Sequence, residues 1–448
     1  MGPRKRTSTT RRRVGRVSLY LHHGAWWLYY RDGGNPVRRK IGQSHDDAEQ
    51  VAAQVNSQLT SGAPSLLAFS PISVPELRQQ FLFYHEKVLK SSMATVCRYR
   101  AATQHLVNYL MPQPKQVQAH EVHPNAFAAH LRGIEVAPNG HPHTKKRRLR
   151  DKGIQYILEC CRAMYTFAAK QRHLPPYAGN PFAELPLDRL KVEDAKPIYV
   201  FNQASELAFF KAASPWEFGV HFTLAKTGLR IGELVHLLIE DIDLGTGWLH
   251  VRNKTVLGWR VKTGTERDVP LISEVVAVLE RVINGRKAGP VFLRERFCAR
   301  VSPPLVSDRK VLECVCEERQ REGDGTHSRA ERLHIARTVW RDAGAVNADR
   351  IRISFIRTMA MLGSPDATCP KSWRHSFATL LQDANVDPLI RQITLGHRPT
   401  ASSSSLGMTA HYTHTRRDTQ KNEIERALRL WPLSLKYANR WSQGGESC

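Results

Sequence analysis

The sequence lacks the marks of a membrane or secreted protein. No stretch approaches the roughly eighteen consecutive apolar residues that a membrane span requires. The first sixteen residues, MGPRKRTSTTRRRVGR, are basic but contain no apolar run, so they do not predict a secretory signal. The eight cysteines include no C-x-x-C pair, and Cys314 and Cys316 have no second pair nearby that would complete a zinc site. We therefore expect reduced thiols, no metal, no cofactor, no membrane contact and a cytoplasmic, nucleoid-associated location.

Acidic residues are also scarce. Lys and Arg number 66 against 41 Asp and Glu, which leaves a formal net charge of +25 and a pI near 10.0. Positive side chains in such excess repel one another unless a polyanion offsets their charge, and nucleic acid is the usual polyanion. The apolar fraction of 41% with nine Trp and fifteen Phe excludes global disorder. The length of 448 residues predicts two or three domains.

Residues 1–65 predict a small N-terminal module. Short alternating segments broken by glycines indicate three strands, and residues 44–59 indicate a helix capped by Ser44. We expect the helix to back the sheet and the aromatic residues at 26, 27, 29 and 30 to form its core. The sheet could enter a DNA groove, with contacts from a set of basic side chains: Arg31, Arg38, Arg39 and Lys40.

Residues 72–190 predict an all-α domain, with linkers at 59–75 and 177–197. Several amphipathic segments follow one another, and a basic run at 145–152 introduces the last of them. This run is either a contact to the DNA backbone or a solvated face.

Residues 198–448 predict a third, mainly α domain with a β-hairpin or small sheet. The hairpin would comprise GWLHV and GWRVKTGTERDVPL, with Gly264-Thr265-Glu266 as its turn. The fold class expected for the whole chain is multidomain α+β.

Basic residues and one tyrosine recur at helix and hairpin boundaries of this third domain. Arg230 starts a helix after Gly228, and Lys262 precedes the expected hairpin turn. Lys371, Arg374 and His375 precede one helix, and His397 follows the next, whose expected limits are Asp387 as N-cap and Gly396 as terminator. Such boundaries can converge on an anion.

In this order and spacing the segments resemble the catalytic domain of the tyrosine recombinases, the phage integrase family. The first arginine motif matches TGLRIGEL at Arg230, and the hairpin lysine before an R-x-V-P-L strand matches Lys262. The second arginine box matches KSWRHSFAT at Arg374. The LGH motif gives His397, and the Y-T-H motif gives the nucleophile Tyr412. The resemblance extends to the family's core-binding domain for the middle piece and its arm-binding domain for the first.

Three departures from the family pattern accompany the resemblance. Lys371 replaces the first histidine of the second box, keeping a cation but changing its acid–base behaviour. The insertion at 295–368 is unusually long. The link between His397 and Tyr412 is also longer than usual.

The resemblance implies site-specific DNA recombination through a covalent 3′-phosphotyrosyl intermediate, for integration or excision of a phage or other mobile element. The expected partners are double-stranded DNA attachment sites, a homotetramer on that DNA, and accessory directionality or DNA-bending factors. The C-terminal amphipathic segment around Ile424 would then dock on a neighbouring protomer or pack on its own domain. Two alternatives stay open: a non-catalytic DNA-binding relative, and strand relaxation like that of a type IB topoisomerase.

Overall fold

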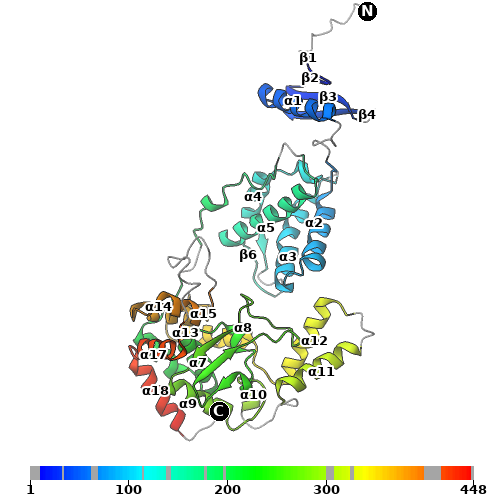
Figure 1. Ribbon diagram of the computed structural model, residues 1–448. Helices are drawn as coiled ribbons and strands as arrows, with labels where there is room; N and C mark the ends of the chain where they lie inside the picture. The colour runs from blue at the N-terminus through cyan, green and yellow to red at the C-terminus, as the bar shows by residue number, and fades with distance from the viewer. Residues whose placement is uncertain are drawn as a thin grey trace, which may run out of the picture. The chain divides into compact units, whose positions relative to one another are not determined.

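The computed structural model describes residues 11–32, 35–61, 69–113, 116–137, 143–175, 179–194, 198–298, 307–322, 327–397 and 415–444 (Figure 1). The chain divides into two compact units, Met1–Ala195 and Lys196–Cys448, each with its own buried cores. The predicted class, multidomain α+β, is confirmed. No helix in these ranges has the length and apolar content needed to cross a membrane.

The N-terminal module is a four-stranded antiparallel sheet with one helix, where three strands were predicted. The extra strand, β1 (Arg11–Val14), forms from the basic tail and pairs with β2 (Val17–His22). The order continues through β3 (Ala25–Asp32) and β4 (Asn35–Gly42). Helix α1 (His45–Ser61) begins as predicted, with Ser44 Oγ accepting from the Asp47 backbone N–H at 3.3 Å.

The two faces of this sheet differ in character. One face packs on α1 through Val17, Leu19, Leu28 and Tyr30. Because side chains alternate along a strand, Trp27 and Tyr29 lie on the opposite face, so placing them in the core was wrong. Pairing puts Arg38 opposite Tyr29 and Lys40 opposite Trp27 on that open face. Arg39 instead shares the α1 side with Leu28, which removes it from the predicted set of groove contacts.

The second part of the first unit is a helical bundle, as predicted. Its helices are α2 (Val74–Phe83), which runs on into a π-helical turn (Tyr84–Val88), α3 (Met93–Leu110), α4 (Pro124–Gly133) and α5 (Asp151–Lys170). The basic run contributes to a two-stranded ribbon of β5 (Glu135–Val136) and β6 (Arg147–Arg148). Phe182 and Leu187 lie inside the predicted domain limits of 72–190 and are buried in the bundle core, so the start of the predicted linker at 177 was wrong.

The second unit is mainly helical around one large core. The elements that build it are α6 (Gln203–Ala212), α7 (Pro215–Thr227), α8 (Ile231–Leu234), α9 (Ser273–Ile283), α13 (Ala348–Met361), α14 (Lys371–Asp383), α15 (Pro388–Leu395), α17 (Arg417–Leu428) and α18 (Pro432–Gln443). In the centre, Trp373 of α14 stacks on Phe201 with ring centroids 3.8 Å apart. The residue before Arg374 is therefore a main anchor of the core.

The predicted hairpin is present with different limits. Strand β8 (Trp248–Val251) pairs antiparallel with β9 (Arg267–Pro270), and β7 (Ile242–Asp243) adds a third strand. Residues 252–266 form a long connection rather than a strand and a tight turn. The prediction of a second strand through GWRVK was wrong, because these residues pair locally across the Lys254–Trp259 bridge instead of continuing the ladder.

The predicted insertion at 295–368 is partly core. Helix α13 buries Ile351, Phe355 and Met359 in the main core, so it belongs to the domain proper. Besides the short α10 (Glu295–Cys298), the remaining described helices of the stretch are α11 (Arg309–Arg321) and α12 (Arg329–Asp342), coloured yellow in Figure 1. They enclose a separate small core that includes Leu312 and Val339. The extra element is therefore a helical pair.

The C-terminal helices pack on their own domain. Ile424, Ala427 and Leu428 of α17 are fully buried in the main core. Helix α18 lies against α9 and α6, with Leu435 and Ala438 buried. Of the two interpretations of the C-terminal segment, packing on its own domain therefore holds for the residues that the structure describes.

A buried histidine predicts acid sensitivity of this unit. The Trp373 Nε1–H donates to His221 Nδ1 at 3.1 Å, and Ser354 Oγ lies 2.9 Å from His221 Nε2. Burial lowers the pKa of His221 to about 3. Burial is also the main cause that lowers the pKa of His236 to about 4. An unfolded histidine takes up a proton near pH 6.5, so the free energy of unfolding should fall as pH falls from about 6.5 to about 3, by up to about 1.4 kcal/mol per pH unit for His221.

The matched variant is His221→Gln, which offers an acceptor and a donor but does not titrate. We would measure urea unfolding by tryptophan fluorescence at several pH values. The free energy of unfolding of this variant should fall less steeply with decreasing pH, and the difference in slope should correspond to about one proton. Parallel pH dependences for the two proteins would contradict the assignment.

Candidate active site

The first element of the site is a sharp turn between α7 and α8. Gly228 ends α7 with φ +61°, and a Cβ there would lie 2.4 Å from Phe377 Cδ1, so only glycine fits. The turn places Arg230 at the N-cap of α8, a single helical turn where a longer helix was expected. Arg230 is thereby fixed by backbone geometry at the surface of the core, with 24% of its side chain exposed.

Arg374 lies one turn into α14, where the sequence had placed it before the helix. It is 7% exposed, and its Nη1 donates to Gly228 O at 2.6 Å. Its Nη2 donates to Leu395 O and also lies 3.1 Å from His397 Nε2. One guanidinium thus joins the turn before α8 to the end of α15.

His397 follows the predicted helix boundary. Helix α15 begins after Asp387 as N-cap and ends at Gly396, whose φ is +64°. Because arginine only donates, His397 Nε2 accepts from Arg374, and the neutral ring carries its proton on Nδ1. Burial, followed by the charge of Arg374, lowers the pKa of His397, so the ring is neutral at pH 7.

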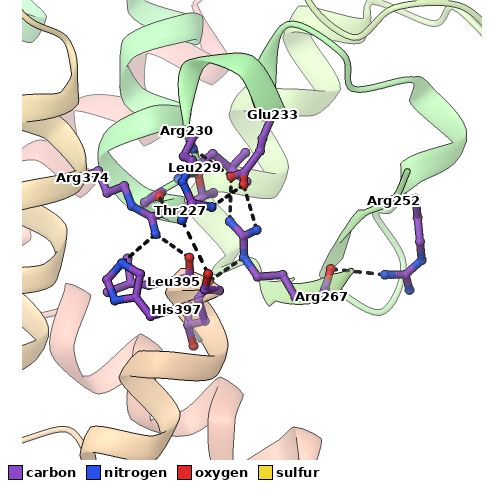
Figure 2. Close-up of polar contacts among 12 residues, drawn as sticks. Thr227, Leu229, Arg230, Glu233, Arg252, Arg267, Arg374, Leu395 and His397 are labelled. Carbon is purple, nitrogen blue, oxygen red and sulfur yellow. Dashed lines mark hydrogen bonds and ion pairs between the residues drawn. The ribbon is translucent and has the colours of Figure 1, made fainter. Parts of the chain in front are cut away.

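Glu233 and Arg267 connect these elements (Figure 2). Glu233 is only 3% exposed, so it is not an ordinary surface carboxylate. It accepts from Arg230 Nη1 at 2.8 Å and, as a bidentate partner, from Arg267 Nη1 and Nη2 at 3.0 and 2.7 Å. Arg267 Nε donates to Thr394 O at 2.9 Å, and Arg230 Nη2 lies 3.5 Å from Gly396 O.

Arg267 was not among the sequence-predicted residues. Its signal was present, since it is the arginine that opens the RDVPL strand, but arginines at strand starts are usually solvated. Gly396 explains the fit: a Cβ on it would lie 2.9 Å from Arg267 Cδ. The buried Arg267–Glu233 pair fixes Arg230 from behind.

The charges of the cluster act on one another. Burial alone would raise the pKa of Glu233, but the hydrogen bonds and charges of Arg267 and Arg230 outweigh it, and the net shift is downward. Burial and then the charge of Arg230 lower the pKa of Arg374 to about 9, which still leaves it cationic at pH 7. One carboxylate faces three guanidinium groups, so the cluster is ready to receive an anion.

The other predicted residues are placed as follows. Lys371 lies on the first turn of α14 with an exposed side chain, and its charge contributes to lowering the pKa of His397. Lys262 is exposed in the connection between β8 and β9. Tyr412 lies outside the described residues, within 398–414. The structure therefore brings together Arg230, Arg374 and His397, and assigns no contact to Lys262.

The next question is whether the described residues could bind a metal ion. Among the described residues, no group of three His, Cys, Asp or Glu side chains is placed to hold a metal ion. What the cluster offers is planar guanidinium donors and a neutral imidazole N–H, which suit the non-bridging oxygens of a phosphodiester.

Comparison with known proteins agrees with this arrangement. Residues 211–418 match the phage integrase family, a range that contains every predicted site residue. Residues 211–418 therefore contain a segment similar to the phage integrase family.

Individual relatives are distant. The chain is 28% identical over 209 residues to the tyrosine recombinase XerC of Pelobacter propionicus, covering 46% of this chain and 49% of that protein. It is 24% identical over 261 residues to the transposase from transposon Tn916 of Enterococcus faecalis, covering 55% of each. The chain thus spans about half the length of the curated relatives it matches.

A solved structure shares the fold. The Tn1549 transposon integrase, determined in complex with transposon right end DNA, superposes with a TM-score of 0.51 at 18% identity. The match covers 79% of this chain and 99% of that one. The likeness extends beyond the segment matched by the family and supports the predicted architecture.

Proposed function

We propose that this protein is a site-specific recombinase that cuts and rejoins DNA through a 3′-phosphotyrosyl intermediate, for integration or excision of a phage or other mobile element. The observation that carries the proposal is that hydrogen bonds bring Arg230, Arg374 and His397 together from three separate segments. Glu233 and Arg267 hold that arrangement from the buried side.

The two arginines would neutralise the phosphate. A phosphodiester repels nucleophiles, and negative charge accumulates on its non-bridging oxygens as the transition state forms. Arg230 and Arg374 supply permanent charge with bidentate geometry, and their positions are set before the substrate arrives. The Nδ1–H of His397 adds a neutral donor.

Tyr412 would be the nucleophile. Its phenol has an ordinary pKa near 10, and surrounding cations lower the free-energy cost of the phenolate. Attack of its oxygen on phosphorus forms the phosphotyrosyl bond and breaks the bond to the 5′ oxygen. Lys262 would donate a proton to that leaving oxygen. The covalent bond retains the energy of the phosphodiester, so a 5′-hydroxyl of another strand reseals it without ATP or metal.

The two N-terminal parts of the chain would bind DNA without taking part in the reaction. We assign residues 1–65 to arm-type DNA binding through the open face that carries Arg31, Arg38 and Lys40, and residues 72–190 to core-site binding. Residues 198–448 form the catalytic domain. Assembly as a homotetramer on double-stranded attachment sites, accessory directionality or DNA-bending factors, and a nucleoid location follow from the same assignment.

The test is formation of a covalent protein–DNA complex. The substrate is a nicked duplex carrying the direct repeats found in the DNA that flanks the gene. Denaturing electrophoresis should show a protein–DNA band for the unaltered chain and none for Tyr412→Phe, because only the hydroxyl can attack phosphorus. Tyr437→Phe, which alters a tyrosine packed against Phe218, is the matched control and should keep the band.

Other outcomes select the alternatives. Tight, salt-sensitive binding without a covalent band would identify a non-catalytic relative. Relaxation of supercoiled plasmid that requires Tyr412, without joining of two sites, would identify an activity like that of a type IB topoisomerase.

A further inference from the structure

The connection that carries Lys262 is anchored at its base. Residues 252–266 leave the sheet after β8, and Lys254 and Trp259 pair through two backbone hydrogen bonds of 3.0 Å each. Lys254 Nζ also forms a buried ion pair with Asp241 Oδ2 at 2.7 Å. A connection that loops out of a sheet is ordinarily mobile, whereas this one is held in place at its base.

The helical pair α11–α12 supplies three further contacts, all to backbone carbonyls of this connection. Arg309 Nη2 donates to Asn253 O at 3.0 Å, and Trp340 Nε1 donates to Leu257 O at 3.0 Å. The Cys316 thiol lies 3.4 Å from Val256 O. Each donor comes from the extra element, and each acceptor comes from the segment that leads to Lys262.

Packing reinforces these bonds. Leu257 is 1% exposed and lies in the small core of the helical pair. Gly258 has φ +69°, and a Cβ there would lie 2.9 Å from Ala336 Cβ of α12. The backbone of the connection therefore approaches the helix as closely as a glycine permits.

Asn253 relays this anchoring to the lysine. Its carbonyl accepts from Arg309, while its side chain accepts from Val261 N at 2.9 Å and donates to Gly264 O at 3.5 Å. Val261 O in turn accepts from Gly264 N at 2.8 Å. Lys262 lies between these two residues, so the turn that presents it is closed through Asn253.

We propose that α11–α12 is a positioning element for Lys262: Arg309 and Trp340 hold the 252–266 connection so that the lysine meets the leaving 5′ oxygen. The inference rests on the proposed function, in which Lys262 is the general acid. The proposal assigns a role to the helical pair α11–α12, for which the sequence indicated none. Arg309 and Trp340 are positioning residues and touch no DNA in this proposal.

The test compares two leaving groups. In a substrate with sulfur in place of the bridging 5′ oxygen, the leaving thiolate needs no proton, because thiols have a pKa near 8.5. Lys262→Ala should lose about 10²–10⁴-fold in cleavage of the oxygen substrate and recover with sulfur. The double variant Arg309→Met/Trp340→Phe should lose about tenfold or more with oxygen and come within about threefold of the unaltered chain with sulfur.

The matched control is Arg321→Met/Trp216→Phe. Arg321 lies on the same helix as Arg309 and forms an ion pair with Glu317, and Trp216 Nε1 donates to Leu293 O at 2.8 Å, outside the 252–266 connection. This control should cleave both substrates at the unaltered rate. An equal loss on both substrates by the double variant, or no loss on either, would overturn the proposal.

A second measurement does not depend on catalysis. Amide hydrogen exchange over residues 253–264 of the full chain should be at least about tenfold faster in the double variant and unchanged in the control. Unchanged exchange in the double variant overturns the inference even if cleavage is active. If sulfur fails to rescue Lys262→Ala, the acid role in the proposed function fails, and the exchange result alone decides whether the helical pair holds the turn.

Discussion

Arg374→Lys should reduce the rate of covalent complex formation by about 10³-fold, in the range found when a principal donor to a developing phosphate charge is lost. Arg374 spans two backbone carbonyls in different segments, Gly228 O and Leu395 O, and still directs a donor toward His397. A lysine keeps the charge but has one ammonium group, which cannot reach both carbonyls and a phosphate. The measurement is single-turnover cleavage of the nicked substrate with protein in excess.

Arg352→Lys is the control for this prediction, because Arg352 is exposed on α13 away from the cluster. Its rate should stay within about twofold of the unaltered chain, as for an ordinary surface substitution. DNA affinity at fixed salt should be similar for both variants, since one charge is conserved in each. A cleavage rate above one tenth of the unaltered value in Arg374→Lys would show that a bidentate donor is not needed there.

Glu233→Gln should lower the free energy of unfolding by about 3–5 kcal/mol, the cost of removing one partner from a buried ion pair. Arg267 has only 4% of its side chain exposed and pairs with both oxygens of Glu233. Without the carboxylate, the guanidinium groups of Arg230, Arg267 and Arg374 face one another with no anion between them. Chemical denaturation at pH 7 measures the loss.

The pKa of Glu233 is lowered in the folded state, so its contribution is present above about pH 4.5 and is lost as pH falls through the folded-state pKa. The difference between the unaltered chain and Glu233→Gln should therefore narrow in acid. Glu280→Gln, on an exposed position of α9, should change stability by less than about 0.5 kcal/mol. A loss below about 1 kcal/mol for Glu233→Gln would mean that the arginines find other partners.

The site was largely predictable because its residues stand at helix boundaries. Gly228, Asp387 and Gly396 mark their turns by residue type alone, and the structure has the boundaries there. Arg230 and His397 are fixed relative to these marks, whereas Arg374 lies one turn inside α14 and meets them through a contact between distant segments. The roles of Lys262 and Tyr412 remain predictions.

The parts that could not be predicted depend on contacts between distant segments. Arg267 pairs with Glu233, 34 positions earlier, and no local pattern indicates a partner that far away. The strand expected through residues 258–263 alternates correctly, but Trp259 forms a local bridge with Lys254, and Val261 is buried in the main core. Helix α13 was assigned to the insertion because it lies in the long stretch between the VPL strand and the second arginine box, although one side of it is core.

Apart from the carboxylate of Glu233, the acceptors that hold the arginines are main-chain carbonyls: Gly228 O, Thr394 O, Leu395 O and Gly396 O. Every amino acid carries such a carbonyl, so a side-chain change at 394 or 395 alters packing but deletes no acceptor. Among the residues that supply these carbonyls, mutational sensitivity should therefore concentrate at Gly228 and Gly396, whose positive φ values set the carbonyl directions. The sequence around the arginines can thus change while the candidate site keeps its shape, provided that Glu233 and these two glycines are kept.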